Sequence, residues 1–236
     1  MVGLGGCQPE LPVPGAPETP AEWLAAAARR HDPAGRWPVF AGEISVGSAF
    51  SDGEVAFRQD FYIDRGADTF RRSVTRAGAV LVQTAGPSGC RATYPANDLS
   101  PAERQTLGLT GDPCAAILPR RRLQEFLLGL PMSALTPQTR LGAAVRADTV
   151  LGRDVVTVDL TFEDDPGGQV WRLHLDAETA ELVAAGFDFS DGSGELIEYG
   201  DRVAFEGFWL AGRRVFYDGL TGGFVVEERL TFSGIE

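Results

Sequence analysis

Two neighbouring segments, VVTVDLTF (155–162) and WRLHLD (171–176), decide the fold of this protein. In both segments apolar and polar side chains alternate, which is typical of strands with one buried face and one solvated face. We expect the two apolar sets to face one shared interior and the intervening polar side chains to face solvent. The apolar sets are Val156, Val158, Leu160 and Phe162, then Trp171, Leu173 and Leu175. The intervening residues are Thr157, Asp159 and Thr161, then Arg172, His174 and Asp176.

Short segments of the same β type extend in both directions from this pair. Turn residues break residues 39–85 into four expected antiparallel strands, and the strands resume after residue 142 and continue to the C-terminus. The turns DDPGG (164–168), SDGSG (190–194) and TGG (221–223) are typical of hairpins. We therefore predict an α+β fold in which about eleven strands form one antiparallel sheet with helices on one face.

Helices are predicted at the start of the chain and in an insertion over residues 86–135 that splits the strands. Thr19-Pro20-Ala21-Glu22 is a capping box that begins a helix ending near Arg30. Inside the insertion, Ser100-Pro101-Ala102-Glu103 is a second capping box, and Asp112-Pro113 is the start of a further helix.

The segment RRRLQEFLLGLP (120–131) predicts an amphipathic helix that ends at its Gly-Leu-Pro sequence. Leu123, Phe126 and Leu127 lie at spacings of three and four residues and therefore form one stripe. This stripe must be buried, either against the apolar face of the sheet or against a bound acyl chain. The three arginines are either a solvated helix start or a basic surface that rests on anionic lipid head groups.

Composition limits the class of protein. The chain has 236 residues, 44% of them hydrophobic, which is enough for one large domain with a substantial core. The formal net charge is −12, and all 21 basic residues are arginines. An acidic surface repels phosphate backbones, so nucleic acid is not an expected partner. No apolar run approaches the roughly 18 residues of a membrane-spanning helix.

The sequence contains no motif that predicts catalysis or a metal site. The two histidines, His31 and His174, lie in different predicted elements, whereas a zinc site needs several converging ligands. The segment from Asp188 resembles a calcium loop only superficially, because Ser193 replaces the glycine and Tyr199 the glutamate that such a loop needs. Motifs for a serine nucleophile, a phosphate loop or a dinucleotide site are absent from the sequence. We therefore expect neither enzyme activity nor a cofactor.

The three cysteines divide into a pair and a single residue. A disulfide between Cys90 and Cys114 would close a loop of roughly 24 residues and stabilise the fold by ~3 kcal/mol through chain entropy. Such a bond indicates an oxidising compartment, and two buried reduced thiols are the alternative. Cys7 lies apart, directly before a proline-rich stretch that predicts an extended, solvated tether.

Leu4-Gly5-Gly6-Cys7 resembles the lipobox of bacterial lipoproteins, in which a peptidase cuts before the cysteine and the thiol carries diacylglycerol. The resemblance implies that Cys7 is lipidated and that residues 1–18 tether a domain of residues 19–236 to a membrane. Only Met1-Val2-Gly3 precedes this box, where a signal peptide would have basic and apolar regions. We expect the true start to lie upstream, and an ordinary tail cysteine is the alternative.

The segment HDPAGRW (31–37), with GLPM (129–132), resembles an uncharacterised family of bacterial, often Bacteroidetes-type, lipoproteins. The motif residues are His31, Asp32, Pro33 and Trp37. The family also tends to have cysteines at the positions of Cys90 and Cys114. Considered without the family, the motif has a structural role, because Pro33 stops the helix and Trp37 covers the sheet edge as an apolar plug.

The order of a helix, strands, a helical insertion and more strands is in turn similar to the LolA and LppX type of half-barrel. This resemblance implies a curved antiparallel sheet that wraps the N-terminal helix and the mid-chain insertion and holds acyl chains in its concavity. We therefore expect a non-catalytic, monomeric protein of the cell envelope, held at the membrane only by a lipid anchor, that binds an acyl chain, lipid or lipoprotein. The expected ligand contacts are Leu123, Phe126, Leu127, Trp171 and Leu173. An interaction module with a packed interior is the alternative, and a hydrolase with an unrecognised site is the third hypothesis.

Overall fold

The computed structural model describes residues 17–51, 55–76, 79–94, 100–106, 111–163, 169–188 and 193–234. The lipobox-like segment with Cys7, almost all of the predicted tether, the DDPGG turn and most of the SDGSG turn lie outside these residues. The lipidation of Cys7 and the division into a tether and a domain therefore stay predictions.

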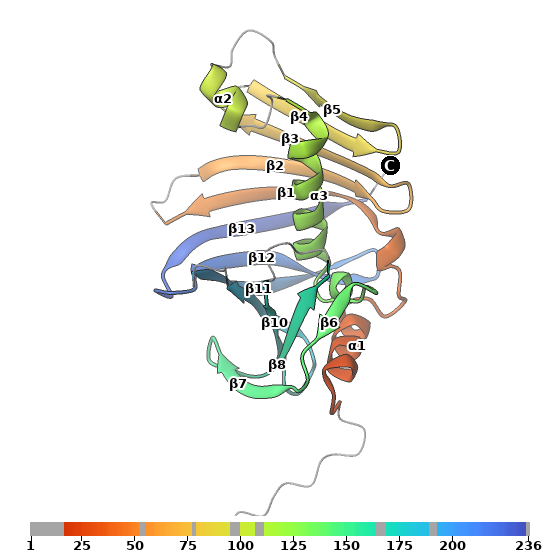
Figure 1. Cartoon of the computed structure of the whole chain (residues 1–236), viewed down its shortest axis with the longest axis vertical. Coiled ribbons are helices and arrows are strands. Elements are labelled where there is room, and N and C mark those ends of the chain that lie inside the picture. Colours follow the sequence, from red (N-terminus) through yellow and green to blue (C-terminus); the bar gives the residue numbers. More distant parts are fainter. Residues whose placement is uncertain are drawn as a thin grey trace, which may run out of the picture.

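One large, open and curved antiparallel sheet forms the body of the described chain (Figure 1). Its strands follow the order β5-β4-β3-β2-β1-β13-β12-β11-β10-β9-β8-β6, and β7 also pairs with β8. The strands are β1 (Ala41–Phe50), β2 (Val55–Asp64), β3 (Thr69–Arg76), β4 (Ala79–Gly86), β5 (Gly89–Thr93), β6 (Thr139–Leu141), β7 (Arg146–Val150), β8 (Arg153–Phe162), β9 (Trp171–Asp176), β10 (Leu182–Asp188), β11 (Gly194–Phe205), β12 (Phe208–Asp218) and β13 (Phe224–Ser233). The predicted α+β half-barrel is confirmed, with thirteen strands in the described residues where about eleven were expected.

Pairing of the first and last strands joins the two halves of the sheet. Strands β1–β5 form one series of hairpins and β8–β13 form another, and the β1 and β13 strands lie side by side and antiparallel. Ile44 of β1 is the register partner of Phe232. The first and last strands are therefore at the centre of the sheet, where each has a hydrogen-bonded neighbour on both sides.

The three α-helices of the described residues begin at the residues that the sequence indicates. α1 (Pro20–His31) has the predicted capping box, in which the Thr19 hydroxyl accepts a hydrogen bond from the Glu22 N–H. The remaining helical elements are η1 (Trp37–Val39), α2 (Pro101–Thr106), α3 (Pro113–Gly129) and η2 (Met132–Ala134). α3 is longer than the predicted segment of residues 120–131, because it continues through Pro119 from the Asp112 cap. It crosses the concave face in front of β1–β4 and β13 (Figure 1).

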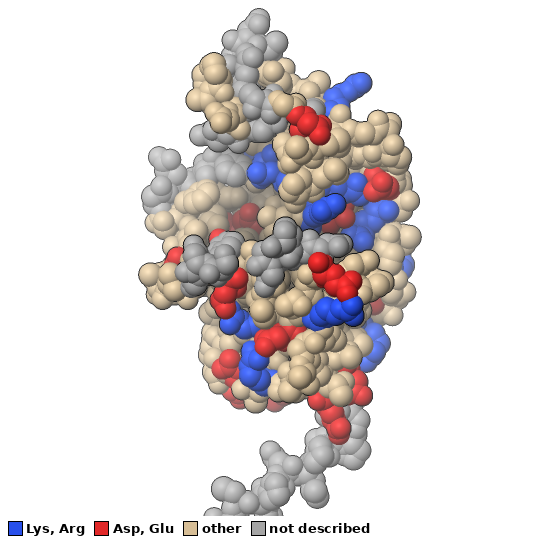
Figure 2. All heavy atoms as spheres, in the orientation of Figure 1, with Lys and Arg blue, Asp and Glu red and all other residues tan. Residues whose placement is uncertain are grey.

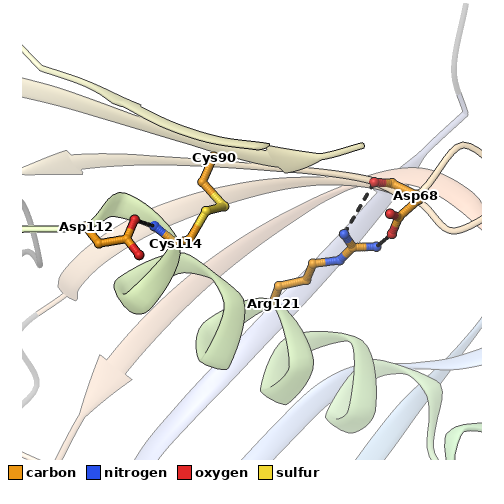
Figure 3. The surroundings of a disulfide bond; sticks show 5 residues. All are labelled: Asp68, Cys90, Asp112, Cys114 and Arg121. Atoms are coloured by element: carbon orange, nitrogen blue, oxygen red, sulfur yellow. Dashed lines mark hydrogen bonds and ion pairs between the residues drawn. A yellow bond between two sulfur atoms is a disulfide. The ribbon is translucent and has the colours of Figure 1, made fainter. Parts of the chain in front are cut away.

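The disulfide is confirmed and fastens the first turn of α3 to the edge strand β5 (Figure 3). The Cα atoms of Cys90 and Cys114 are 5.2 Å apart, inside the range that a disulfide spans. On the same turn, the Asp112 carboxylate accepts a hydrogen bond from the Cys114 N–H at 2.9 Å. Two turns further along, Arg121 pairs with Asp68 in the β2–β3 turn at 2.8 Å. α3 is thus held at its start and along its side.

Two apolar clusters fill the space between the helices and the sheet. The first confirms the predicted shared interior, because the inward residues of β8 and β9 pack with α1 and with the end of α3. Its members from the two opening segments are Val158, Leu160, Trp171, Leu173 and Leu175, with Val156 and Phe162 partly buried beside them. The second cluster joins β1–β4 and β13 to Ile117 and Leu128 of α3.

The predicted solvation of the other face of these strands is wrong at two positions. His174 is buried, and it shares a hydrogen bond of 2.9 Å with the hydroxyl of the equally buried Thr157. The reason is a third apolar cluster on this outer face, formed by Val155, Val183 and Ala184 with partly buried neighbours. Burial also lowers the pKa of His174. His174 is therefore part of a covered outer surface and not a solvated surface histidine.

Candidate functional site

The motif that follows α1 lies in the interior of the fold. His31 is buried and bridges two strands: its Nε2 accepts a hydrogen bond from the Leu182 N–H at 3.1 Å, and its Nδ1–H donates to the Trp209 carbonyl at 2.7 Å. Burial, and then the charge of Arg202, lower the pKa of His31 to about 4. The imidazole is therefore neutral near pH 7 and has no nitrogen left for a ligand.

Asp32 and Trp37 hold the end of α3 against the sheet. One carboxylate oxygen of Asp32 accepts a hydrogen bond from the Trp37 N–H at 2.6 Å. The buried Trp37 ring packs on Phe40, with ring centroids 5.0 Å apart, and on Gly129, where a Cβ atom would lie only 2.1 Å from the ring. Trp37 lies between α3 and the sheet and does not cover a sheet edge. Asp32 Oδ1 and Trp37 Nε1 are buried without a hydrogen-bond partner in the described residues, so the structural role of the motif stays a prediction.

A groove of about 520 Å³ lies beside this motif, between α1, η1, α3 and η2. Trp37 and Phe126 form part of its apolar lining, and Asp32 and Arg65 contribute charge. The Arg65 guanidinium lies 4.9 Å from the centre of the Trp37 ring and pairs with Glu125 at 3.0 Å. The inward-facing residues of the later strands do not line this groove, so it is distinct from the concavity that the sequence analysis assigned to the ligand.

The structure brings four of the five predicted ligand residues together. Leu127, Trp171 and Leu173 are buried in the first cluster, and the half-buried Phe126 packs against it. The rings of Phe126 and Trp171 meet edge to face at a centroid distance of 4.8 Å. Leu123 is separate, because 48% of it is exposed. The stripe therefore is partly core and partly open apolar surface.

A band of buried polar residues crosses the concave face beside α3, and the sequence analysis missed it. In the first half of the sheet it consists of Gln59, Arg72 and Gln83, which are at most 5% exposed. Arg72 donates from Nε to Gln59 at 2.7 Å and from Nη1 to Gln83 at 2.9 Å. The signal was in the sequence, because each of these residues occupies an inward position next to apolar inward residues two positions away, such as Phe70 and Val74 around Arg72.

The band continues across β1, β13, β12 and β11. Glu228 of β13 has Ser48 and Arg214 as its register partners, and Arg214 in turn lies opposite Tyr199. Arg214 is 2% exposed and pairs with Glu228 at 2.6 Å, yet its Nε and Nη1 atoms have no hydrogen-bond partner among the described residues. The Tyr199 hydroxyl donates to the Leu127 carbonyl of α3 at 3.3 Å.

A very small cavity lies beneath α3 at Arg214. Its volume of about 10 Å³ is enough for about one water molecule. Apolar side chains of β1, β2 and β13 surround it, together with Gln124 and Leu128 of α3. A larger molecule enters this part of the concave face only if α3 moves away from the sheet.

Comparison with known proteins supports the fold and no closer assignment. Neither a family model nor a curated protein matches the sequence. A LolA superfamily protein from Nitrosomonas europaea has a TM-score of 0.54 at 14% identity, over 92% of this chain and 94% of that chain. A putative outer membrane lipoprotein-sorting protein domain from Vibrio parahaemolyticus has a TM-score of 0.51 at 12% sequence identity, over 92% of this chain and 95% of that chain. A DUF1329 family protein from Desulfovibrio piger has a TM-score of 0.50 at 9% sequence identity, over 91% of this chain and 92% of that chain.

These likenesses confirm the class of fold, a LolA-like half-barrel. The lipoprotein family that the motif of residues 31–37 resembles stays a prediction. Within the described residues no group of His, Cys, Asp or Glu side chains is arranged to hold a metal ion. None of the described helices combines the length and the apolar character that a membrane span requires.

Proposed function

We propose that this protein is a non-catalytic protein of the cell envelope that binds an apolar ligand, such as an acyl chain, a lipid or a lipoprotein, on the concave face of the half-barrel. The observation that carries the proposal is the position of α3. This helix lies across the concave face and leaves the apolar side chain of Leu123 about half exposed, one turn before the partly buried Phe126. An exposed leucine that continues a core stripe is a suitable contact for an acyl chain.

The location in the envelope rests on separate observations. The Cys90–Cys114 disulfide is typical of proteins in oxidising compartments, and the Cys7 segment resembles a lipobox. One neighbour in fold is described as an outer membrane lipoprotein-sorting protein domain. Expression of the full gene with labelled palmitate, followed by membrane fractionation, tests this location. Label that persists in Cys7→Ser would contradict lipidation of Cys7.

Binding is tested by native mass spectrometry after mild purification, together with lipid extraction. We expect a bound mass that extraction identifies as lipid, and uptake of an added fluorescent fatty acid. Leu123→Asp should abolish uptake, because a charge in the stripe repels the chain. Leu118→Asp is the matched control, since Leu118 is also exposed on α3 but lies about 140° away around the helix. A clean ligand-free mass with no uptake would contradict the proposal.

The second candidate, an interaction module with a packed interior, is favoured by one observation. The inward residues of β8–β10 pack in one cluster with α1 and α3, and the predicted ligand residues Trp171 and Leu173 are buried in this cluster. A pull-down from envelope fractions separates the two candidates, because a carrier should bring lipid and a module should bring a protein. The hydrolase hypothesis has no support from the described residues, since His31 and His174 are both buried and hydrogen-bonded.

A further inference from the structure

The buried Arg72 has no counter-ion among the described residues. Its guanidinium is held by the neutral side-chain oxygens of Gln59 and Gln83, and no carboxylate in the described part of the chain pairs with it. Burial, and then the like charge of Arg120, lower the pKa of Arg72 to about 9. The two glutamines accept hydrogen bonds from Nε and Nη1 and thereby orient the guanidinium group.

Arg120 adds a second positive charge from α3. Arg120 is exposed, its charge acts on Arg72, and the surrounding protein atoms lower its own pKa. It has no ion pair in the described part of the molecule, whereas its neighbour Arg121 pairs with Asp68 and Glu125. Ile117 of α3 packs in one cluster with Phe70 of β3. Arg72 follows Phe70 by two residues on the same face of the sheet, and Arg120 follows Ile117 by three residues on the same side of the helix. The concave face therefore has one guanidinium group held by strands and a second on the helix that crosses them.

Arg72 and Arg120 differ in their ion pairing from most other arginines of the described residues. Most other arginines of the described residues pair with carboxylates, and Figure 2 shows basic and acidic side chains interspersed over one face. Even the buried Arg214 meets Glu228. A buried charge without a counter-ion is destabilising, and a like charge on the neighbouring helix adds to this effect. An acidic ligand group that accepts hydrogen bonds from both guanidinium groups removes this effect.

We propose that the concave face binds acyl ligands that carry an acidic head group, a carboxylate or a phosphate, and that Arg72 and Arg120 hold this group. The proposal rests on the proposed function and specifies its ligand class. Arg120 and Leu123 lie three residues apart on one side of α3, about 4.5 Å apart along the helix axis. The head group thus sits at Arg120 while the chain beside it contacts Leu123.

The test compares three ligands with the same chain, tetradecanoate, tetradecyl phosphate and tetradecanol, and adds inorganic phosphate. Each is titrated below its micelle concentration into the full protein at about pH 8, where the carboxylate is ionised. We expect the two acidic ligands to bind at least about tenfold more tightly than the alcohol. Equal binding of the three chains would overturn the inference and leave the proposed function intact. No binding of any chain would overturn the proposed function.

Substitutions of single arginines test which residues hold the acidic head group. Arg120→Gln should reduce the preference for acidic ligands about tenfold and leave tetradecanol binding unchanged. Arg122→Gln is the matched control, because it removes the same charge from an exposed arginine that lines the other groove. Arg72→Gln should reduce the same preference, and circular dichroism shows whether it still folds. Arg120→Gln remains informative if Arg72→Gln does not fold. An unchanged preference in Arg120→Gln, or inorganic phosphate binding as tightly as tetradecyl phosphate, would overturn the inference.

Discussion

Replacing Gly129 by alanine tests whether Trp37 locks the end of α3. The added methyl carbon would lie 2.1 Å from Cζ2 and 2.3 Å from Cε2 of the Trp37 ring, well inside the ~3.5 Å of carbon–carbon contact. The ring is 4% exposed and packs against Phe40 and Phe208, so it has no free space to turn into. The backbone itself accepts alanine, because Gly129 is not among the residues with positive φ.

Two opposing effects set the size of the change. Alanine is favoured over glycine within a helix by up to about 1 kcal/mol, whereas overpacking a buried site costs about 1 to 3 kcal/mol and occasionally more. The neighbour of Gly129 is a rigid buried ring, so we expect a cost in the upper part of this range. The free energy of unfolding should therefore fall by about 2 kcal/mol, measured by urea denaturation with circular dichroism.

Two further variants make the result specific. Gly47→Ala is the matched control, because nothing lies within 4 Å of the added Cβ, and its effect should stay within about 0.5 kcal/mol. Trp37→Phe replaces the clashing part of the indole, so Gly129→Ala should cost about 1 kcal/mol less in that background. A Gly129→Ala protein as stable as the wild type, or additive effects in the double variant, would refute the reasoning.

Three other substitutions have defined outcomes. Cys90→Ser with Cys114→Ser should lower the free energy of unfolding by ~3 kcal/mol, since the bond closes a 24-residue separation; equal stability of wild type with and without reductant would contradict this. The pKa of His31 is about 4 when folded, below its unfolded value of ~6.5, so the unfolded state binds the proton first and stability falls as pH drops through this window. The His31→Gln variant should therefore lose less stability than the wild type between about pH 7 and about pH 5, measured by thermal unfolding. An equal loss in both proteins would contradict the lowered pKa of His31. Phe126→Ala should destabilise the half-buried site by about 2 kcal/mol, less than the 3 to 5 of a fully buried phenylalanine, and should reduce fatty-acid uptake; a larger loss of stability with normal uptake would favour the packed module.

The sequence by itself determined the local elements of this protein, because each depends on neighbours along the chain. Alternation over residues 155–162 and 171–176 predicted both strands and their inward faces, which the first cluster confirms. The Thr19 capping box and the Asp112 cap predicted the starts of α1 and α3. The pairing of Cys90 with Cys114 followed from the cysteine count and is confirmed as well.

Only the tertiary structure decided which residues meet across long distances. The pairing of β1 with β13 could not be predicted from the sequence of either strand. The alternation of apolar and polar residues in a strand is the same whichever strand it pairs with. His174 has the sequence pattern of a solvated residue and is buried, because Val155, Val183 and Ala184 form a cluster on the outer face. The position of Arg120 on the side of the sheet that carries Arg72 likewise arises from α3 crossing β3 on the concave face, where Ile117 packs with Phe70. Periodicity states which face a side chain points to, but what covers that face depends on the packing of distant segments.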